Sequence, residues 1–292
     1  MPNSTLARLF QETAMRGSAD AGFGVEWYAT HHSIWVIHDL TIEHRRPIHY
    51  RDELAITTWV SDIQRVRSHR EYLARNAKTN EIVACGRAYW AHLDTRTMLP
   101  ARIPINITEF FGPNGISAIA RLKPRAYPLA APIAPREIRG TRRVQRYEAD
   151  GMQHANNAVY LDWLEEALAD AAPTSTLLRP AQDARSLCVR RHDIEYVRSA
   201  LPGDDVIISV RLAGMGQCAS AWNLEITRAG ETLVRDHITA FWRDENAKPI
   251  RLYSFVVASN SPSLTRTAIS LRPTTCNLVF TTRPVFFSRT IA

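Results

Sequence analysis

The chain has 292 residues, of which 45% are hydrophobic and 22% are charged, and its formal net charge is +7. This length allows one large domain or two smaller ones, and the composition is typical of a globular protein. No apolar stretch approaches the roughly 20 residues that a membrane helix needs, so the sequence predicts no membrane span. The first residues lack the basic and apolar regions of a signal peptide, which predicts a cytoplasmic location.

The positive charge favours an anionic partner of some kind. Helix-turn-helix, zinc-finger and RNA-recognition patterns are missing from the sequence, so we expect no nucleic-acid partner. The four cysteines lie far apart, which predicts reduced thiols rather than a disulfide framework or a metal site. The histidines lack metal-ligand spacing as well, so the sequence predicts no metal and no other cofactor. The cysteines are Cys85, Cys188, Cys218 and Cys276.

An internal repeat organises the chain. Ala88-Tyr-Trp90 aligns with Ala240-Phe-Trp242 at an offset of 152 residues, and residues 10–14 align with residues 163–167 one residue further out. Each half is therefore expected to consist of one helix followed by about four strands. The alignment leaves residues 150–154 without a counterpart in the first half, which is expected to lack a first strand.

Strands are predicted where β-branched and aromatic residues cluster between turn residues. Short connections between them indicate an antiparallel sheet, and one long apolar helix per half gives a layered α+β unit. The second helix is expected over residues 157–172 and should be buried on nearly all sides, because apolar residues cover most of its circumference. The predicted strands are residues 34–43, 53–60, 66–76 and 81–93, then 187–197, 205–213, 218–228 and 231–243.

Two segments differ from this pattern. Residues 105–140 are rich in proline and arginine, which predicts a stiff, basic linker between the halves. Residues 253–292 are rich in serine and threonine, contain no Asp, Glu or Lys, and show no clear periodicity. We expect this tail to be disordered.

The most informative stretch runs from Arg146 to Ala167. Asp150 and His154 lie four residues apart in a loop that leads directly into the second helix. The N-terminus of a helix presents unpaired N–H groups and a partial positive charge, which can polarise a carbonyl oxygen. An acid, an imidazole and such an oxyanion site suit hydrolysis of an activated acyl group. The alternative interpretation is that Asp150 and Asn156 only cap the helix.

The same stretch resembles the Asp-x-x-x-His-x-Asn-Asn-x-x-Tyr-x-x-Trp-x-Glu-x-Ala signature of hotdog-fold acyl thioesterases. These include the 4-hydroxybenzoyl-CoA thioesterases and the acyl-acyl carrier protein thioesterases. The resemblance implies a double hotdog, with two repeats that each wrap an antiparallel sheet around a long central helix. Residues 1–104 would form an N-terminal hotdog without a first strand or a catalytic loop, and residues 141–252 the catalytic hotdog. The first half is then a non-catalytic partner, or the true start of the chain lies upstream.

The resemblance also implies roles for individual residues. Asp150 would act as general base on water or as nucleophile, and His154 would orient Asp150 or the carbonyl, while backbone N–H groups of residues 155–157 hold the oxyanion. Asn156, Asn157 and Tyr160 would bind the substrate, although a helix start and core packing also explain them.

The chain departs from the plant acyl carrier protein thioesterases at two places. They carry Asn where this chain has Met152, and an acid and a cysteine where it has Ser199 and Ala200. This favours the simpler arrangement of acyl-CoA thioesterases, which depends on one Asp.

The implied function is hydrolysis of an acyl thioester, with acyl carrier protein or acyl-CoA as the substrate. The basic linker is either a solvated connector or part of a docking surface for such a donor, and a homodimer is left open. A non-catalytic acyl- or carrier-binding hotdog module is one alternative. A hotdog hydratase or dehydratase is another, although the chain lacks the Asp-x-Asn-Pro-x-His motif and the His–Glu pair of those enzymes.

Overall fold

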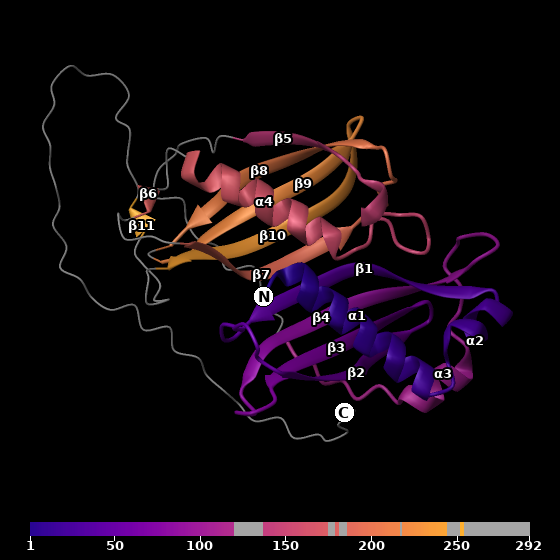
Figure 1. The fold of residues 1–292 in the computed structure, drawn as a ribbon. Coiled ribbons are helices and arrows are strands. Elements are labelled where there is room, and N and C mark those ends of the chain that lie inside the picture. The colour runs from indigo at the N-terminus through magenta and orange to yellow at the C-terminus, as the bar shows by residue number, and fades with distance from the viewer. Residues whose placement is uncertain (120–136, 175–178, 181–185, 217, 244–251, 254–292) are drawn as a thin grey trace, which may run out of the picture.

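One continuous antiparallel sheet dominates the computed structural model, which describes residues 1–119, 137–174, 179–180, 186–216, 218–243 and 252–253. The sheet has nine strands in the order β2-β3-β4-β1-β7-β10-β9-β8-β5. Two long helices lie against it, one in each half of the chain (Figure 1).

The first half begins with its helix, and four strands follow at the predicted places. In β4 four consecutive residues, 83–86, are buried, so this strand does not show the simple alternation of a sheet that is buried on one side only. The elements are α1 (Asn3–Asp20), α2 (Val25–Thr30), β1 (Ser33–His44), β2 (Leu54–Gln64), β3 (Arg67–Asn76), β4 (Ile82–Asp94) and α3 (Ile105–Phe111).

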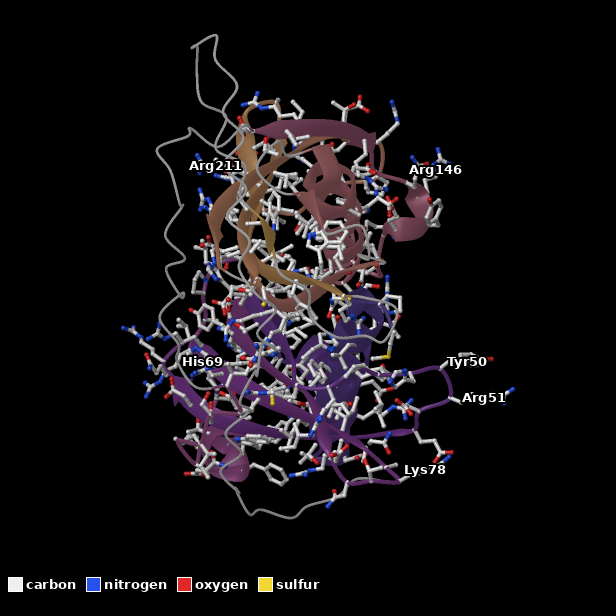
Figure 2. All side chains as sticks on the ribbon, turned by 90° about the vertical axis from the view of Figure 1, so that its left-hand side faces the viewer. Tyr50, Arg51, His69, Lys78, Arg146 and Arg211 are labelled. Carbon is white, nitrogen blue, oxygen red and sulfur yellow. The ribbon has the colours of Figure 1, made fainter. Side chains whose placement is uncertain are left out.

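The second half repeats this plan with one additional strand before its helix. That strand, β5, pairs with β8, and seen end-on the sheet curves around α4 (Figure 2). The elements are β5 (Ile138–Arg143), η1 (Arg146–Glu148), α4 (Val159–Thr174), β7 (Ser186–Tyr196), β8 (Asp205–Met215), β9 (Ser220–Arg228) and β10 (Glu231–Arg243). Two short strands, β6 (Arg179–Pro180) and β11 (Leu252–Tyr253), pair separately.

The two halves join through antiparallel pairing of β1 with β7. Thr41 pairs with Asp193, which is its own counterpart in the repeat, and the Thr41 hydroxyl donates to Asp193 Oδ1 at 2.9 Å. Leu40 pairs with Ile194, and Ile42 pairs with His192. Since Ile194 is the repeat counterpart of Ile42 and His192 is that of Leu40, the pairing is symmetric about Thr41 and Asp193. This is the register of an isologous contact, in which each partner presents the same surface to the other.

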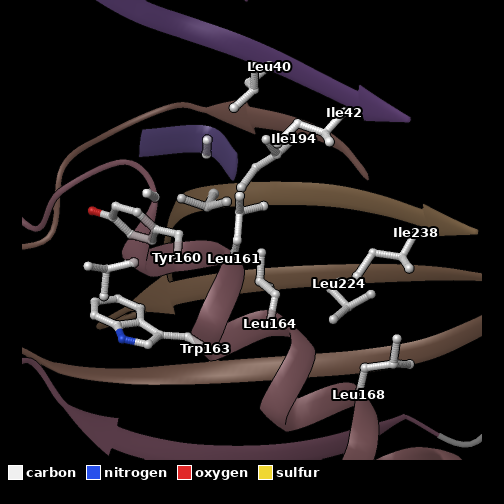
Figure 3. Close-up of a cluster of buried hydrophobic side chains, with 14 of the residues drawn as sticks. Leu40, Ile42, Tyr160, Leu161, Trp163, Leu164, Leu168, Ile194, Leu224 and Ile238 are labelled. Atoms are coloured by element: carbon white, nitrogen blue, oxygen red, sulfur yellow. The ribbon is translucent and has the colours of Figure 1, made fainter. Parts of the chain in front are cut away.

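The helix α4 supplies much of the core of the second half. Leu161, Leu164 and Leu168 are fully buried, and they face Leu224 and Ile238 of the surrounding sheet (Figure 3). The expectation that this helix is buried on nearly all sides is wrong, because a stripe along it is exposed. The exposed residues are Asp162, Glu166, Ala169 and Asp170.

The predicted linker contains regular structure at both ends. Helix α3 occupies residues 105–111, and β5 begins at residue 138. Residues 120–136 of this segment, and residues 254–292 of the predicted tail, lie outside the described residues.

The cysteines only partly match their prediction. Cys85 and Cys188 form no disulfide bond, but Cys218 is disulfide-bonded, so the prediction of a reduced thiol is wrong at that position. Among the described helices, none is long and apolar enough to cross a membrane.

A buried ionic cluster lies at the junction of the halves. His192 Nδ1 lies 2.6 Å from Asp236 Oδ2, and its Nε2 lies 3.2 Å from Glu165 Oε1 on α4. On the other side of the junction, the His44 ring hydrogen-bonds to Asn3 at the start of α1. Burial alone would lower the pKa of His192, but the two carboxylates outweigh it and raise this pKa to about 10. Burial, and then the His192 charge, lower the pKa of His44 to about 4.

These two shifts predict a stability maximum near neutral pH. A raised histidine pKa stabilises the fold fully below the ordinary value of 6.5, and this contribution is lost as the pH rises towards 10. A lowered pKa has the opposite effect, so His44 contributes stability above pH 6.5 that is lost as the pH falls towards 4. Urea unfolding followed by circular dichroism should therefore give the largest free energy near pH 6.5.

The variant His44→Gln isolates one limb of this profile. It should weaken the loss of stability between pH 6.5 and 4 and leave the alkaline limb unchanged. Parallel profiles for the variant and the wild type would contradict the role given to His44.

Close packing of α1 on the sheet depends on Gly86 in β4. The Phe10 ring of α1 stacks on Tyr72 at a centroid distance of 4.8 Å and covers the glycine. A Cβ atom at position 86 would lie 2.4 Å from Cε2 and 2.7 Å from Cδ2 of Phe10. Gly86→Ala should therefore lower the free energy of unfolding by roughly 1–3 kcal/mol through overpacking. Gly140→Ala, whose Cβ meets nothing within 4 Å, is the matched control and should have little effect in the same denaturation experiment.

Candidate functional site

A tight loop between η1 and α4 carries the predicted acid and imidazole. Its ends are held by a β-bridge between Ala149 and Ala155. Within the loop, Asp150 N donates to His154 O at 2.8 Å, and Gln153 N donates to Asp150 O at 3.0 Å. Gln153 adopts a left-handed φ of 63°, which allows the chain to reverse there. The structure therefore brings Asp150 and His154 together as main-chain partners at the base of one turn.

The Asp150 carboxylate is oriented by its own loop. Its Oδ1 accepts the Met152 N–H at 2.9 Å, the local bond that aspartate commonly makes two residues ahead. No hydrogen bond within the described part of the chain reaches Oδ2. Asp150 and His154 are half-buried, and residues 151–153 are exposed. One carboxylate oxygen is thus fixed, and the other remains available to water or substrate.

Most backbone N–H groups at the start of α4 are already used. Ala155 N donates to Ala200 O and Asn156 N to Glu148 O, each at 2.9 Å. The Asn156 side chain accepts the Ala158 N–H at 3.0 Å, which is the capping role of the alternative interpretation. Within the described residues, the N–H of Asn157 has no hydrogen-bond partner, and it lies at the positive end of the helix dipole. Of the three N–H groups predicted to hold the oxyanion, only that of Asn157 is available.

Tyr160 connects the loop to the segment that follows β7. It is 2% exposed, and its hydroxyl accepts the Ala200 N–H at 2.7 Å. Burial raises the pKa of Tyr160 to about 12, and the nearby Asp150 carboxylate acts in the same direction. The Tyr196 hydroxyl donates to Asn157 O at 2.9 Å and so fixes the peptide that follows the free N–H. Tyr160 therefore lies in the core behind the loop, and its predicted role in substrate binding stays a proposal.

Two residues of this region, Tyr196 and Glu148, were given no role from the sequence. Tyr196 and Ala200 contact the loop from about 40 positions away, and Ala200 was named only as a departure from the plant enzymes. Glu148 is buried beside the loop and had one available signal, because Gln145-x-x-Glu148 has the spacing of a capping box, which the structure contains.

An open depression of about 600 Å³ lies elsewhere, at the start of α2. None of the predicted site residues lines it. Its lining residues are Gly22, Gly24, Val25, Glu26, Trp27, Thr30 and His31.

The Tyr160 hydroxyl should contribute measurably to stability. Tyr160→Phe leaves the buried Ala200 N–H without an acceptor, which costs roughly 1–3 kcal/mol of unfolding free energy. Chemical denaturation measures this loss. Tyr147→Phe is the matched control, since Tyr147 is 84% exposed and its variant should unfold like the wild type. Equal effects of the two substitutions would show that the Tyr160–Ala200 bond contributes nothing.

Each half of the chain matches a known family of thioesterases. Residues 3–111 match the acyl-ACP thioesterase N-terminal domain, and residues 152–235 match the thioesterase superfamily. An oleoyl-acyl carrier protein thioesterase of Coriandrum sativum is 22% identical over 74% of this chain. An acyl-[acyl-carrier-protein] hydrolase of Cuphea viscosissima is 24% identical over 69% of this chain. The chain spans 62% and 51% of the length of these two relatives.

Solved structures give the same fold. The 12:0-ACP thioesterase of Umbellularia californica superimposes with a TM-score of 0.65 and 17% identity, covering 83% of this chain and 88% of its own. An acyl-ACP thioesterase of Bacteroides thetaiotaomicron gives a TM-score of 0.60 and 17% identity, with 81% and 88% coverage. The hotdog fold is therefore confirmed, and so is the resemblance of this chain to the hotdog-fold acyl thioesterases.

Proposed function

We propose that this chain is a double-hotdog acyl thioesterase, which hydrolyses an acyl thioester to a free acid and a thiol. One observation carries the proposal most strongly. Asp150 and His154 are paired in a turn beside the free N–H of Asn157, at the positive end of α4. The repeat and the register around Thr41 and Asp193 support two hotdog units that contact each other as a symmetric dimer does.

In this proposal the two units have different tasks. Residues 141–252 form the catalytic hotdog, because they contain the Asp150 loop and α4. Residues 1–104 form the non-catalytic partner, which extends the sheet through β1 and packs α1 against α4. Residues 105–140 connect the two units.

The chemistry follows from the weakness of a thioester bond. A thiolate whose parent thiol has a pKa near 8.5 is a good leaving group, so its departure needs little acid assistance. Asp150 accepts a proton from water while that water attacks the carbonyl carbon, or it attacks directly and forms a mixed anhydride that water then cleaves. In both routes the carbonyl electrons move to oxygen, the Asn157 N–H stabilises the oxyanion, and the thiolate leaves as the carbonyl re-forms. His154 orients Asp150 or the carbonyl, and Asn156 and Tyr160 shape the substrate site behind them.

An acyl carrier protein is the donor that we favour, with acyl-CoA as the alternative. The relatives are named for acyl carrier protein substrates, and the net charge of +7 suits an acidic partner. Exposed arginines of the second half, including Arg146 and Arg211, point outward from it (Figure 2). The predicted cytoplasmic location and homodimer stay predictions.

Asp150→Asn tests the proposal directly. The amide keeps the bond to the Met152 N–H but can neither accept the proton nor attack, so turnover should fall by roughly 10²–10⁴-fold. The assay detects the free thiol released from acyl carrier protein and acyl-CoA substrates of graded chain length. Asp170→Asn, on the exposed stripe of α4, is the control and should retain full activity.

Each unexpected result has a distinct meaning. Full turnover by the Asp150 variant would remove Asp150 from the mechanism. Binding of an acylated donor by the wild type without thiol release would identify a binding module instead of an enzyme. Addition of water to an enoyl substrate would identify a hydratase.

A further inference from the structure

Glu148 is a buried carboxylate that the proposed mechanism does not use. It is 8% exposed and lies between β5 and α4, two residues before Asp150. Its Oε1 accepts Arg142 Nη2 at 2.5 Å and Trp163 Nε1 at 2.9 Å, and its Oε2 accepts the Gln145 N–H at 2.7 Å. Both oxygens are therefore engaged by donors, so this carboxylate is held in one orientation.

The partners of Glu148 come from the segments on both sides of the loop. Arg142 belongs to β5, Gln145 precedes η1, and Trp163 lies on the second turn of α4. The Arg142 guanidinium also lies over the Trp163 ring, 4.3 Å from its centre. Strand β5 and helix α4 are therefore connected both through Glu148 and through this direct contact. These contacts fix where the chain leaves β5 relative to the start of α4.

The main chain of Glu148 continues this connection into the site. Its carbonyl oxygen accepts the Asn156 N–H at 2.9 Å. Asn156 directly precedes the free N–H of Asn157, and Glu148 precedes Asp150 by two residues. Glu148 thus joins the two arms of the loop, one of which carries the acid and the other the oxyanion donor.

We infer that Glu148 is a positioning residue, which holds Asp150 and the Asn157 N–H at the separation that the reaction needs. The inference rests on the proposed function. Reacting groups must be held within about 0.5 Å of the productive geometry, and a displacement of about 1 Å can reduce the rate by roughly 100-fold. The exposed residues 151–153 at the tip of the loop have no buried side chains that could supply this constraint themselves.

Glu148→Gln tests the inference with almost no change in volume. One carboxylate oxygen becomes an NH2 group, which cannot accept from Arg142, Trp163 or Gln145, so the connection loosens. We expect kcat to fall roughly 10- to 100-fold with KM nearly unchanged, because Glu148 does not contact the substrate. The pH dependence of kcat should keep its apparent pKa, because Asp150 remains the reacting group.

The chain offers a matched control in Glu71 of β3. This carboxylate is fully buried and accepts the Ser61 hydroxyl at 2.7 Å and the Ala118 N–H at 2.9 Å, with Arg87 Nε at 3.2 Å. It resembles Glu148 in burial and partners but lies in the first half, away from the loop. Glu71→Gln should destabilise the fold without a selective loss of kcat, which separates positioning from general stabilisation.

Hydrogen exchange of the loop amides gives a readout that does not require activity. Amides of residues 150–157 should exchange faster in Glu148→Gln than in the wild type or in Glu71→Gln. Unchanged exchange together with unchanged kcat would overturn the inference. Loss of the acid limb of the pH profile would overturn it too, because Glu148 would then be the reacting group. If the wild type releases no thiol, the proposed function fails, but the exchange experiment still decides whether Glu148 holds the loop.

Discussion

The antiparallel pairing of β1 with β7 is the contact on which the rest of the structure depends. It merges two sheets into one and centres them on Thr41 and Asp193, so that equivalent residues of the two repeats face each other. A contact of this kind normally forms between two separate copies of a protein. Within one chain it removes the concentration dependence of a dimer, and it allows the two halves to diverge while their interface is retained.

The two halves carry different residues at equivalent positions around this junction. The ionic cluster uses His192 and Asp236 of the second half, whereas their counterparts in the repeat are Leu40 and Ala84. Its remaining members, Glu165 and the His44–Asn3 pair, come from α4 and from the first half. Charges that are buried must be paired to be tolerated, so the cluster fixes the helices relative to the junction more than it adds net stability. The first half thereby contributes to the placement of α4.

The sequence predicted the parts of this molecule that depend on local patterns. The eight strands of the repeat, the helix that begins near Asn157 and the turn at Asp150 each follow from residues close together in the chain. It did not predict contacts such as Tyr160 with Ala200 or Tyr196 with Asn157, because partners about 40 residues apart leave no local signal. The exposed stripe of α4 was missed for a related reason, since the side of a helix that faces solvent is set by its neighbours.

The backbone at the start of α4 connects the fold to the chemistry. Ala155 and Asn156 give their N–H groups to Ala200 and Glu148, and these bonds hold the loop against the sheet and against η1. An N–H used in this way cannot also stabilise a developing oxyanion. Because Ala155 and Asn156 use their N–H groups in this way, the Asn157 N–H is the one of these three that has no hydrogen-bond partner in the described part of the chain. The bonds that hold the loop therefore leave this donor unpaired, and an oxyanion held by residues 155–157 must be held through Asn157.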